Sequence, residues 1–191
     1  MKYDKSFLRN KSLLLRKKKY LTVKKFNYNL IFKLIKKHFH SKKITIGGYY
    51  PSNYEVNILK FIEEASKKKF KITLPVIKSS NKMSYKSWAF KEPLYVNQFG
   101  ILEPKNSIKE IIPDLIMVPL VAFDNRLNRI GYGKGYYDRS LRKISKIKKN
   151  AVSLGIAYSF QKCKKIPINN HDFKLDYIFT EKGIITQINR L

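Results

Sequence analysis

The sequence predicts a single α/β domain in which a mainly parallel sheet is flanked by helices, a Rossmann-like three-layer architecture with an N-terminal helical segment. Strand-like and helix-like segments alternate from residue 44 onward. The apolar run at 114–121 has little polar alternation, which is typical of a central parallel strand. Because 191 residues suit one hydrophobic core, we assign residues 1–191 to one domain.

The first 40 residues are expected to be helical and to pack on the α/β core. From residue 4 to residue 40, leucine, isoleucine and phenylalanine recur among lysines at helical spacing. A break at 19–23 predicts two helices rather than one.

The core elements follow in chain order. Pro51 ends a first strand at 44–50, and a helix at 54–68 leads to a second strand at 70–77. Residues 79–87 are polar and predict a turn, followed by a short strand at 87–90. After the buried strand, a helix is expected at 136–148. The last three strands are expected at 151–157, 175–179 and 184–188.

A glycine-rich stretch follows the buried strand, and residues 129–139 read Arg-Ile-Gly-Tyr-Gly-Lys-Gly-Tyr-Tyr-Asp-Arg. Glycines without Cβ atoms let backbone N–H groups close on a bulky anion. The following helix N-terminus and Lys134 add positive charge. A carboxylate beside phosphate needs a cation between them, so Asp138 is predicted to bind Mg²⁺. The stretch indicates a phosphorylated ligand, with a nucleotide as the leading candidate.

The formal net charge of +28 raises the alternative of a lysine-rich nucleic-acid-binding protein that keeps the scaffold without catalysis. Against it, the 34 lysines are spread over the whole chain, as solvated helix faces are. Four of the seven arginines instead gather near the glycines, at positions 126, 129, 139 and 142. Arginine there suggests a need for its planar, bidentate fork. We therefore expect no specific nucleic-acid partner.

The rest of the composition indicates the cellular compartment in which the protein is expected. Cys163 is the only cysteine, which excludes an internal disulfide and fits a reducing compartment. The sequence has neither an apolar run of membrane-spanning length nor the apolar centre of a secretory signal. We expect a cytoplasmic monomer without a membrane partner.

The string from Phe123-Asp124 to Arg139 closely resembles the signature of the 5-formyltetrahydrofolate cyclo-ligase family, and the resemblance runs through the whole chain. Lys5 and Arg9 resemble the family's N-terminal Lys-x-x-x-Arg, with Arg16 as one more matching basic position. Further matches are Gly48-Tyr-Tyr-Pro51 with Glu55, the 100–104 loop Gly-Ile-Leu-Glu-Pro, the strand end at 119–124 and the closing segment at 171–176.

The resemblance implies an enzyme that uses ATP and Mg²⁺ to close 5-formyltetrahydrofolate, polyglutamylated or not, to 5,10-methenyltetrahydrofolate. ADP and phosphate are released, and the formyl group is phosphorylated on the way. The catalytic residues implied are Arg129 and Lys134. Those for ATP are Lys5, Arg9, Arg129, Ile130, Gly131, Tyr132, Gly133, Lys134, Gly135, Tyr136 and Tyr137. Those for the folate are Arg9, Tyr50, Glu55, Tyr132, Gly133, Lys134, Gly135 and Tyr136, and those for the metal are Asp138 and Asp176.

Two positions depart from the family pattern. Asn128 stands where glycine is usual, and because asparagine tolerates the left-handed conformation we expect the turn to survive. Asn57 stands where relatives often carry Asp or Thr, and we leave it out of the site. A different nucleotide-using transferase on a similar fold stays open. It does not, however, explain Glu55, the 103–104 loop and Asp176 together.

Overall fold

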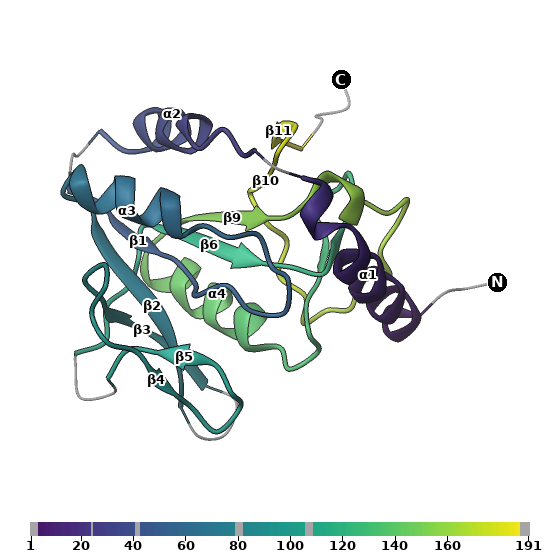
Figure 1. The fold of residues 1–191 in the computed structure, drawn as a ribbon, viewed down its shortest axis with the longest axis horizontal. Helices are drawn as coiled ribbons and strands as arrows, with labels where there is room; N and C mark the ends of the chain where they lie inside the picture. Colours follow the sequence, from purple (N-terminus) through teal and green to yellow (C-terminus); the bar gives the residue numbers. More distant parts are fainter. Residues whose placement is uncertain (1–3, 24, 41–42, 79–81, 106–108, 188–191) are drawn as a thin grey trace.

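The computed structural model describes residues 4–23, 25–40, 43–78, 82–105 and 109–187, and its main element is a mixed sheet (Figure 1). Within these residues, seven strands lie in the order β11-β10-β9-β6-β1-β2-β3. They are β1 (Thr45–Gly47), β2 (Lys71–Lys78), β3 (Lys82–Ser87), β6 (Leu115–Pro119), β9 (Val152–Ile156), β10 (Tyr177–Thr180) and β11 (Gly183–Ile185). The five inner strands are parallel, and β3 and β11 are antiparallel edges. This confirms the predicted α/β class and mainly parallel sheet.

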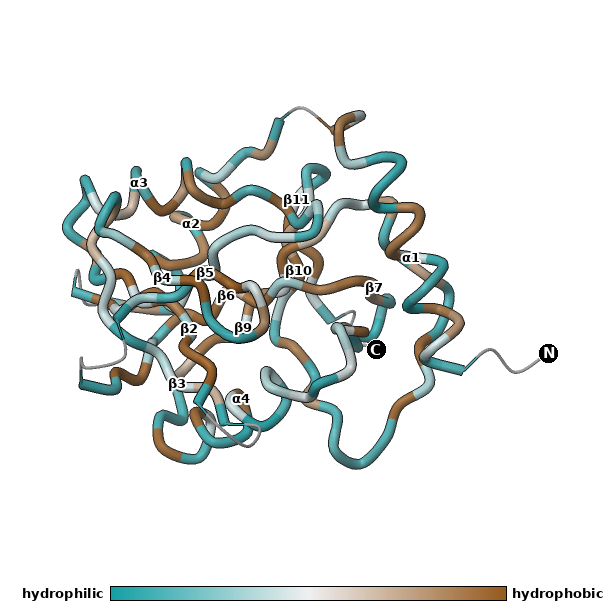
Figure 2. Tube along the Cα trace, turned by 60° about the horizontal axis from the view of Figure 1, so that its bottom comes forward, coloured by the Kyte–Doolittle hydropathy of each residue, from teal (hydrophilic) through white to brown (hydrophobic). Residues whose placement is uncertain are grey.

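Helices cover both faces of the sheet. In Figure 1, α2 (Asn29–His38) and α3 (Leu59–Lys67) lie on one face and α4 (Tyr136–Ile147) on the other. Central strand β6 serves both layers: Leu115 and Met117 join the core with α2 and α3, whereas Ile116 and Val118 join the core with α4. Burial on both sides explains why this strand has no polar alternation. In Figure 2 the brown, apolar segments follow the strands, and polar segments mark the outer turns.

The N-terminal helix α1 (Lys5–Lys19) lies beside the end of the sheet and leads through a short 3-10 turn, η1 (Tyr20–Thr22), toward α2. Asp4 caps it, because its carboxylate accepts a hydrogen bond of 2.8 Å from the Phe7 N–H. The helix packs against β7 (Ala122–Phe123), β8 (Arg129–Ile130) and η2 (Ser159–Gln161). No helix among the described residues is long and apolar enough to cross a membrane.

The sheet topology creates a crevice between β1 and β6. From β1 the chain crosses through α3 to β2 on one side, and from β6 it crosses through α4 to β9 on the other. Neighbouring parallel strands whose connections run in opposite directions leave an opening at their carboxyl ends, where open α/β sheets bind ligands. A small hairpin, β4 (Tyr95–Val96) and β5 (Leu102–Glu103), lies near β2 at this side.

Three sequence-based expectations were wrong. Residues 82–87 form edge strand β3 rather than a turn, and no strand covers 87–90 beyond Ser87. The polar pattern concealed β3 because Ser84 and Lys86 are buried together with Met83 and Tyr85. The helix expected from residue 54 begins only at Leu59, since the chain turns at 52–54 and the Asn57 side chain then accepts a hydrogen bond from the Leu59 N–H.

Replacing Gly155 with alanine tests the packing of the central sheet. A Cβ there would lie 2.7 Å from a Leu175 methyl and 2.8 Å from a Leu120 methyl. We expect Gly155→Ala to lower the free energy of unfolding by about 1–3 kcal/mol in a denaturant titration. In Gly131→Ala the added Cβ meets nothing within 4 Å, so stability should stay within about 0.5 kcal/mol. Equal losses in the two variants would contradict this packing.

Candidate active site

A cavity of about 570 Å³ lies at the carboxyl ends of β1 and β6. It is lined by residues from α1, from the segment after β1, from the β4–β5 hairpin, from the glycine-rich loop and from residues 169–172. All the predicted site residues except one line it: Lys5, Arg9, Tyr50, Glu55, Arg129, Ile130, Gly131, Tyr132, Gly133, Lys134, Gly135, Tyr136, Tyr137 and Asp138. Residues far apart in the sequence thus share one space large enough for more than one small molecule.

Two glycines of the glycine-rich loop have positive φ angles, which other residue types rarely adopt. Gly133 has φ +94°, and Gly135, with φ +67°, is the left-handed N-cap of α4. Both values lie in the region that favours glycine. Arg9 of α1 closes over the loop: its Nε donates 2.8 Å to the Gly131 carbonyl, and its guanidinium lies 3.3 Å from where a Cβ of residue 133 would be. The loop therefore combines a positive helix end with an arginine.

A partly buried ion pair joins the two ends of this loop. The Arg129 side chain is 5% exposed, and its Nη2 lies 2.6 Å from Asp138 Oδ1. Its Nη1 donates to the Phe173 carbonyl, and the Phe173 N–H donates 3.0 Å to Asp138 Oδ1. Burial lowers the pKa of Arg129, and the Asp138 carboxylate opposes that shift. The planar guanidinium thus ties β8, α4 and the 169–173 segment together.

The second predicted metal ligand, Asp176, is not in the cavity. Its carboxylate accepts hydrogen bonds of 2.8 and 2.6 Å from the N–H and hydroxyl of Ser153. Ser153 is near the start of β9 and Asp176 precedes β10, so both lie at the amino end of these parallel strands, opposite the cavity. Asp176 caps this end of the sheet, and the structure does not bring it together with the other predicted site residues.

Asp172, which the sequence analysis did not select, occupies the cavity wall instead. Its carboxylate forms an ion pair with Lys5 and accepts a 2.7 Å hydrogen bond from the Asn169 N–H. The available signal was its position, because Asp172 stands in a loop before the last inner strand, whereas Asp176 directly precedes that strand.

Tyr50 and Glu55, two of the predicted folate-binding residues, line the cavity from the segment after β1. Asn53 and Tyr54 have φ of 46° and 62°, and this left-handed turn brings the Glu55 carboxylate back onto the Ser52 N–H at 3.0 Å. Burial raises the pKa of Glu55, and the hydrogen bond from Ser52 opposes the shift. A half-buried carboxylate that shares the cavity with Tyr50 can bind N–H groups of a flat heterocycle.

The apolar wall was also missed by the sequence analysis. Phe99, Ile101 and Leu102 from the β4–β5 hairpin line the cavity, and the Phe99 ring lies 6.4 Å from that of Tyr136. Glu103 anchors this hairpin, since its carboxylate accepts hydrogen bonds from the Ile77 N–H at 3.1 Å and the Asn97 amide at 2.9 Å. The cavity therefore joins an apolar and aromatic part to a cationic one.

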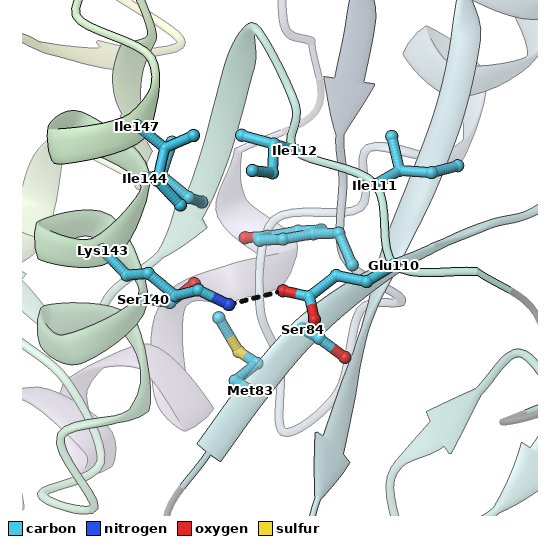
Figure 3. A pocket seen from close by; sticks show the side chains of 10 residues that line it. Met83, Ser84, Glu110, Ile111, Ile112, Ser140, Lys143, Ile144 and Ile147 are labelled. Carbon is cyan, nitrogen blue, oxygen red and sulfur yellow. Dashed lines mark hydrogen bonds and ion pairs between the residues drawn. The ribbon is translucent and has the colours of Figure 1, made fainter.

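A second hollow lies between β3 and α4 (Figure 3), where Lys143 forms a 2.8 Å ion pair with Glu110. Its volume of about 10 Å³ is that of one water molecule. It has no room for a substrate, so the candidate active site is the large cavity.

The large cavity offers oxygen ligands for a magnesium ion, although no group of three or more His, Cys, Asp or Glu side chains is placed for a metal in the part of the chain that the structure describes. Asp138 and Asp172 both line the cavity, and their segments are joined by the Phe173 N–H. Mg²⁺ is commonly held by one or two carboxylates together with waters and substrate phosphates. Two carboxylates beside the glycine-rich loop fit that pattern.

Comparison with known proteins gives consistent results. The model of the 5-formyltetrahydrofolate cyclo-ligase family matches residues 1–181. The chain is 31% identical over 136 residues to the 5-formyltetrahydrofolate cyclo-ligase of Haemophilus influenzae, covering 68% of this chain and 72% of that protein. It is 33% identical over 148 residues to the probable enzyme of Schizosaccharomyces pombe, covering 70% and 72%.

Solved structures agree. The 5,10-methenyltetrahydrofolate synthetase of Aquifex aeolicus superposes with a TM-score of 0.73 at 29% identity, over 98% of this chain and 94% of that one. The Mycoplasma pneumoniae synthetase superposes with a TM-score of 0.65 at 26% identity, over 94% and 99%. With its sequence, its fold and its cavity in agreement, the chain belongs to the 5-formyltetrahydrofolate cyclo-ligase family.

Proposed function

We propose that this protein closes 5-formyltetrahydrofolate to 5,10-methenyltetrahydrofolate, using ATP and Mg²⁺ and releasing ADP and phosphate. Family membership supports the activity. The observation that carries the proposal for the site is the single cavity, in which a phosphate-binding loop faces the carboxylate of Glu55 and the aromatic rings of Tyr50 and Phe99. This arrangement suits a reaction between a nucleotide and a flat, N–H-rich partner.

The chemistry accounts for the cations around the loop. A formamide oxygen is a poor leaving group, so it is first phosphorylated: it attacks the γ-phosphorus of ATP, and the bond to the β-phosphate breaks to release ADP. The N10 amine then attacks the formyl carbon, its proton is lost, and the carbon–oxygen bond breaks to release phosphate. These steps need mainly positioning and neutralisation of charge. We assign that role to Lys5, Arg9, Arg129, Lys134 and the loop N–H groups.

Asp138 and Asp172 are the proposed magnesium-binding residues. Mg²⁺ bound between phosphate and carboxylates would neutralise phosphate charge. Both carboxylates already lie beside cations, Asp138 beside Arg129 and Asp172 beside Lys5. The acidic pair therefore adds little net negative charge to a site that must accept a polyanion.

The direct test is to mix the purified protein, Mg-ATP and 5-formyltetrahydrofolate and to follow the absorbance of the methenyl product. We expect product formation that needs all three components and is matched by one ADP per product. ATP hydrolysis without methenyl product, or no reaction at all, would contradict the proposal.

Valine at position 133 should abolish ATP binding and leave the fold intact. A β-branched side chain disfavours φ +94°, and its Cβ would press on the Arg9 guanidinium at 3.3 Å. Calorimetric titration with Mg-ATP measures the affinity, and thermal unfolding checks the fold. If the affinity is unchanged, the glycine is only a structural turn and phosphate binds elsewhere.

Two aspartates in one segment provide a matched test of the metal assignment. Asp172→Asn should lower turnover at least about tenfold at limiting magnesium, with recovery as magnesium rises, because it removes a ligand. Asp138→Asn should do the same. Asp176→Asn should keep turnover and lose about 1 kcal/mol of stability, because only its bonds to Ser153 weaken. The reverse order of effects would restore Asp176 as the ligand.

Arg129→Lys should lower kcat/KM about tenfold or more although it keeps the charge. A lysine ammonium cannot reproduce the fork that contacts both the Phe173 carbonyl and Asp138. The control is Arg126→Lys, because Arg126 is exposed in the turn before the loop and does not line the cavity. Equal activity of both variants would show that charge alone suffices at position 129.

A further inference from the structure

Arg16 of α1 is a deeply buried charge whose role the reaction scheme leaves open. It is 1% exposed and does not line the cavity. Its Nη1 donates 3.2 Å to the carbonyl of Leu120, just after β6, and its Nη2 donates to the Tyr132 hydroxyl. The guanidinium carbon also lies 5.5 Å from the centre of the Tyr132 ring. Its Nε has no hydrogen-bond partner among the described residues.

A buried guanidinium is costly unless a negative charge compensates it. No carboxylate lies within 4 Å of Arg16 in the described part of the chain, so compensation must come through a neighbour. Glu55 is that charge: burial raises its pKa, and the Arg16 guanidinium and the Tyr132 hydroxyl both oppose that rise. The Tyr132 hydroxyl accepts a hydrogen bond from Arg16, and Tyr132 and Glu55 both line the cavity, so Tyr132 links the buried guanidinium to the side of the cavity that carries Glu55.

We propose that Arg16 is a positioning residue that holds the Tyr132 hydroxyl against Glu55, so that Glu55 meets the folate as a carboxylate. This inference rests on the proposed function, in which Glu55 binds N–H groups of the substrate. Arg16 acts through Tyr132, and Tyr132 belongs to the phosphate-binding loop. The same contact therefore joins the nucleotide side of the cavity to its folate side.

The residue types agree with this role. Arg16 is followed by Lys17, Lys18 and Lys19, which are all exposed. The buried basic position of this helix is thus an arginine. The planar guanidinium of arginine can donate to a carbonyl and a hydroxyl at once. Lysine, with a point charge, would not serve both acceptors in a fixed geometry.

The surroundings of Glu55 decide the sign of the expected pH effect. Burial raises its pKa, and Arg16, Tyr132 and Ser52 lower it. The polar and charged groups that face it, from every packed element, are Arg16, Tyr49, Ser52, Tyr132, Tyr137 and Tyr158. Arg16 and the Tyr132 hydroxyl oppose the effect of burial on the pKa of Glu55. If either is removed, that pKa rises, and Glu55 becomes protonated at a higher pH.

The test is the pH profile of kcat/KM for 5-formyltetrahydrofolate. In Arg16→Gln and Tyr132→Phe the acid limb should move to higher pH, with activity recovering as pH rises. Arg16→Lys should show an intermediate shift. Glu55→Gln should lose this limb. Lys17→Gln, which removes an exposed charge from the same helix turn, should leave the profile unchanged.

The pKa of Glu55, measured by NMR with ¹³C-labelled glutamate, gives a readout that does not need activity. We expect it to rise in Arg16→Gln and in Tyr132→Phe. Tyr132 is 41% exposed, so the Tyr132→Phe variant should fold even if Arg16→Gln does not. An unchanged Glu55 pKa, or a loss of kcat/KM that is equal at all pH values, would overturn the inference. A wild-type protein with the expected Glu55 pKa and no cyclisation would instead overturn the proposed function alone.

Discussion

The partly buried ion pair between Arg129 and Asp138 is the interaction on which the rest of the site depends. It closes the glycine-rich loop at both ends, because Arg129 precedes the glycines and Asp138 follows them in the first turn of α4. Through the backbone of Phe173 it also fixes the segment that carries Asp172. One guanidinium thereby holds the two ends of the loop together with the segment that carries Asp172. Because the Arg129 side chain is buried, salt screens this ion pair less than it screens the exposed lysines.

The order of the strands determines where the Arg129–Asp138 ion pair lies. The crevice between β1 and β6 exists because their crossovers run in opposite directions, and α1 lies against the exposed side of the loop. Helix α1 brings Lys5 and Arg9 to the cavity, and its Arg16 lies behind the lining, bonded to Tyr132. The N-terminal helix is therefore part of the site, and the central parallel strands are the support that holds it.

Local chemistry explains what could be predicted from the sequence. The glycine-rich loop was predictable because left-handed backbone, a helix N-terminus and cations lie within a few consecutive residues. The order of strands and helices followed from apolar patterns of matching period. The site on the other wall was identified by its resemblance to the family, since nothing local distinguishes Glu55 from an ordinary helix-start acid.

What could not be predicted depends on packing between distant segments. Asp172 and Asp176 are four residues apart, and only the direction of the strands shows that one faces the cavity and the other caps the opposite edge. Strand β3 was concealed by Ser84 and Lys86, which pack inside against expectation for polar residues. Phe99 reaches the cavity only because Glu103 pins its hairpin to β2.

The central claim is that the formyl oxygen is phosphorylated in this cavity before the ring closes. The most direct measurement uses 5-formyltetrahydrofolate labelled with ¹⁸O in the formyl group and mass spectrometry of the released phosphate. Because the carbon–oxygen bond breaks only after that oxygen is bonded to phosphorus, the account predicts one ¹⁸O in each phosphate formed with methenyl product. Unlabelled phosphate, with the ¹⁸O lost to water, would contradict it.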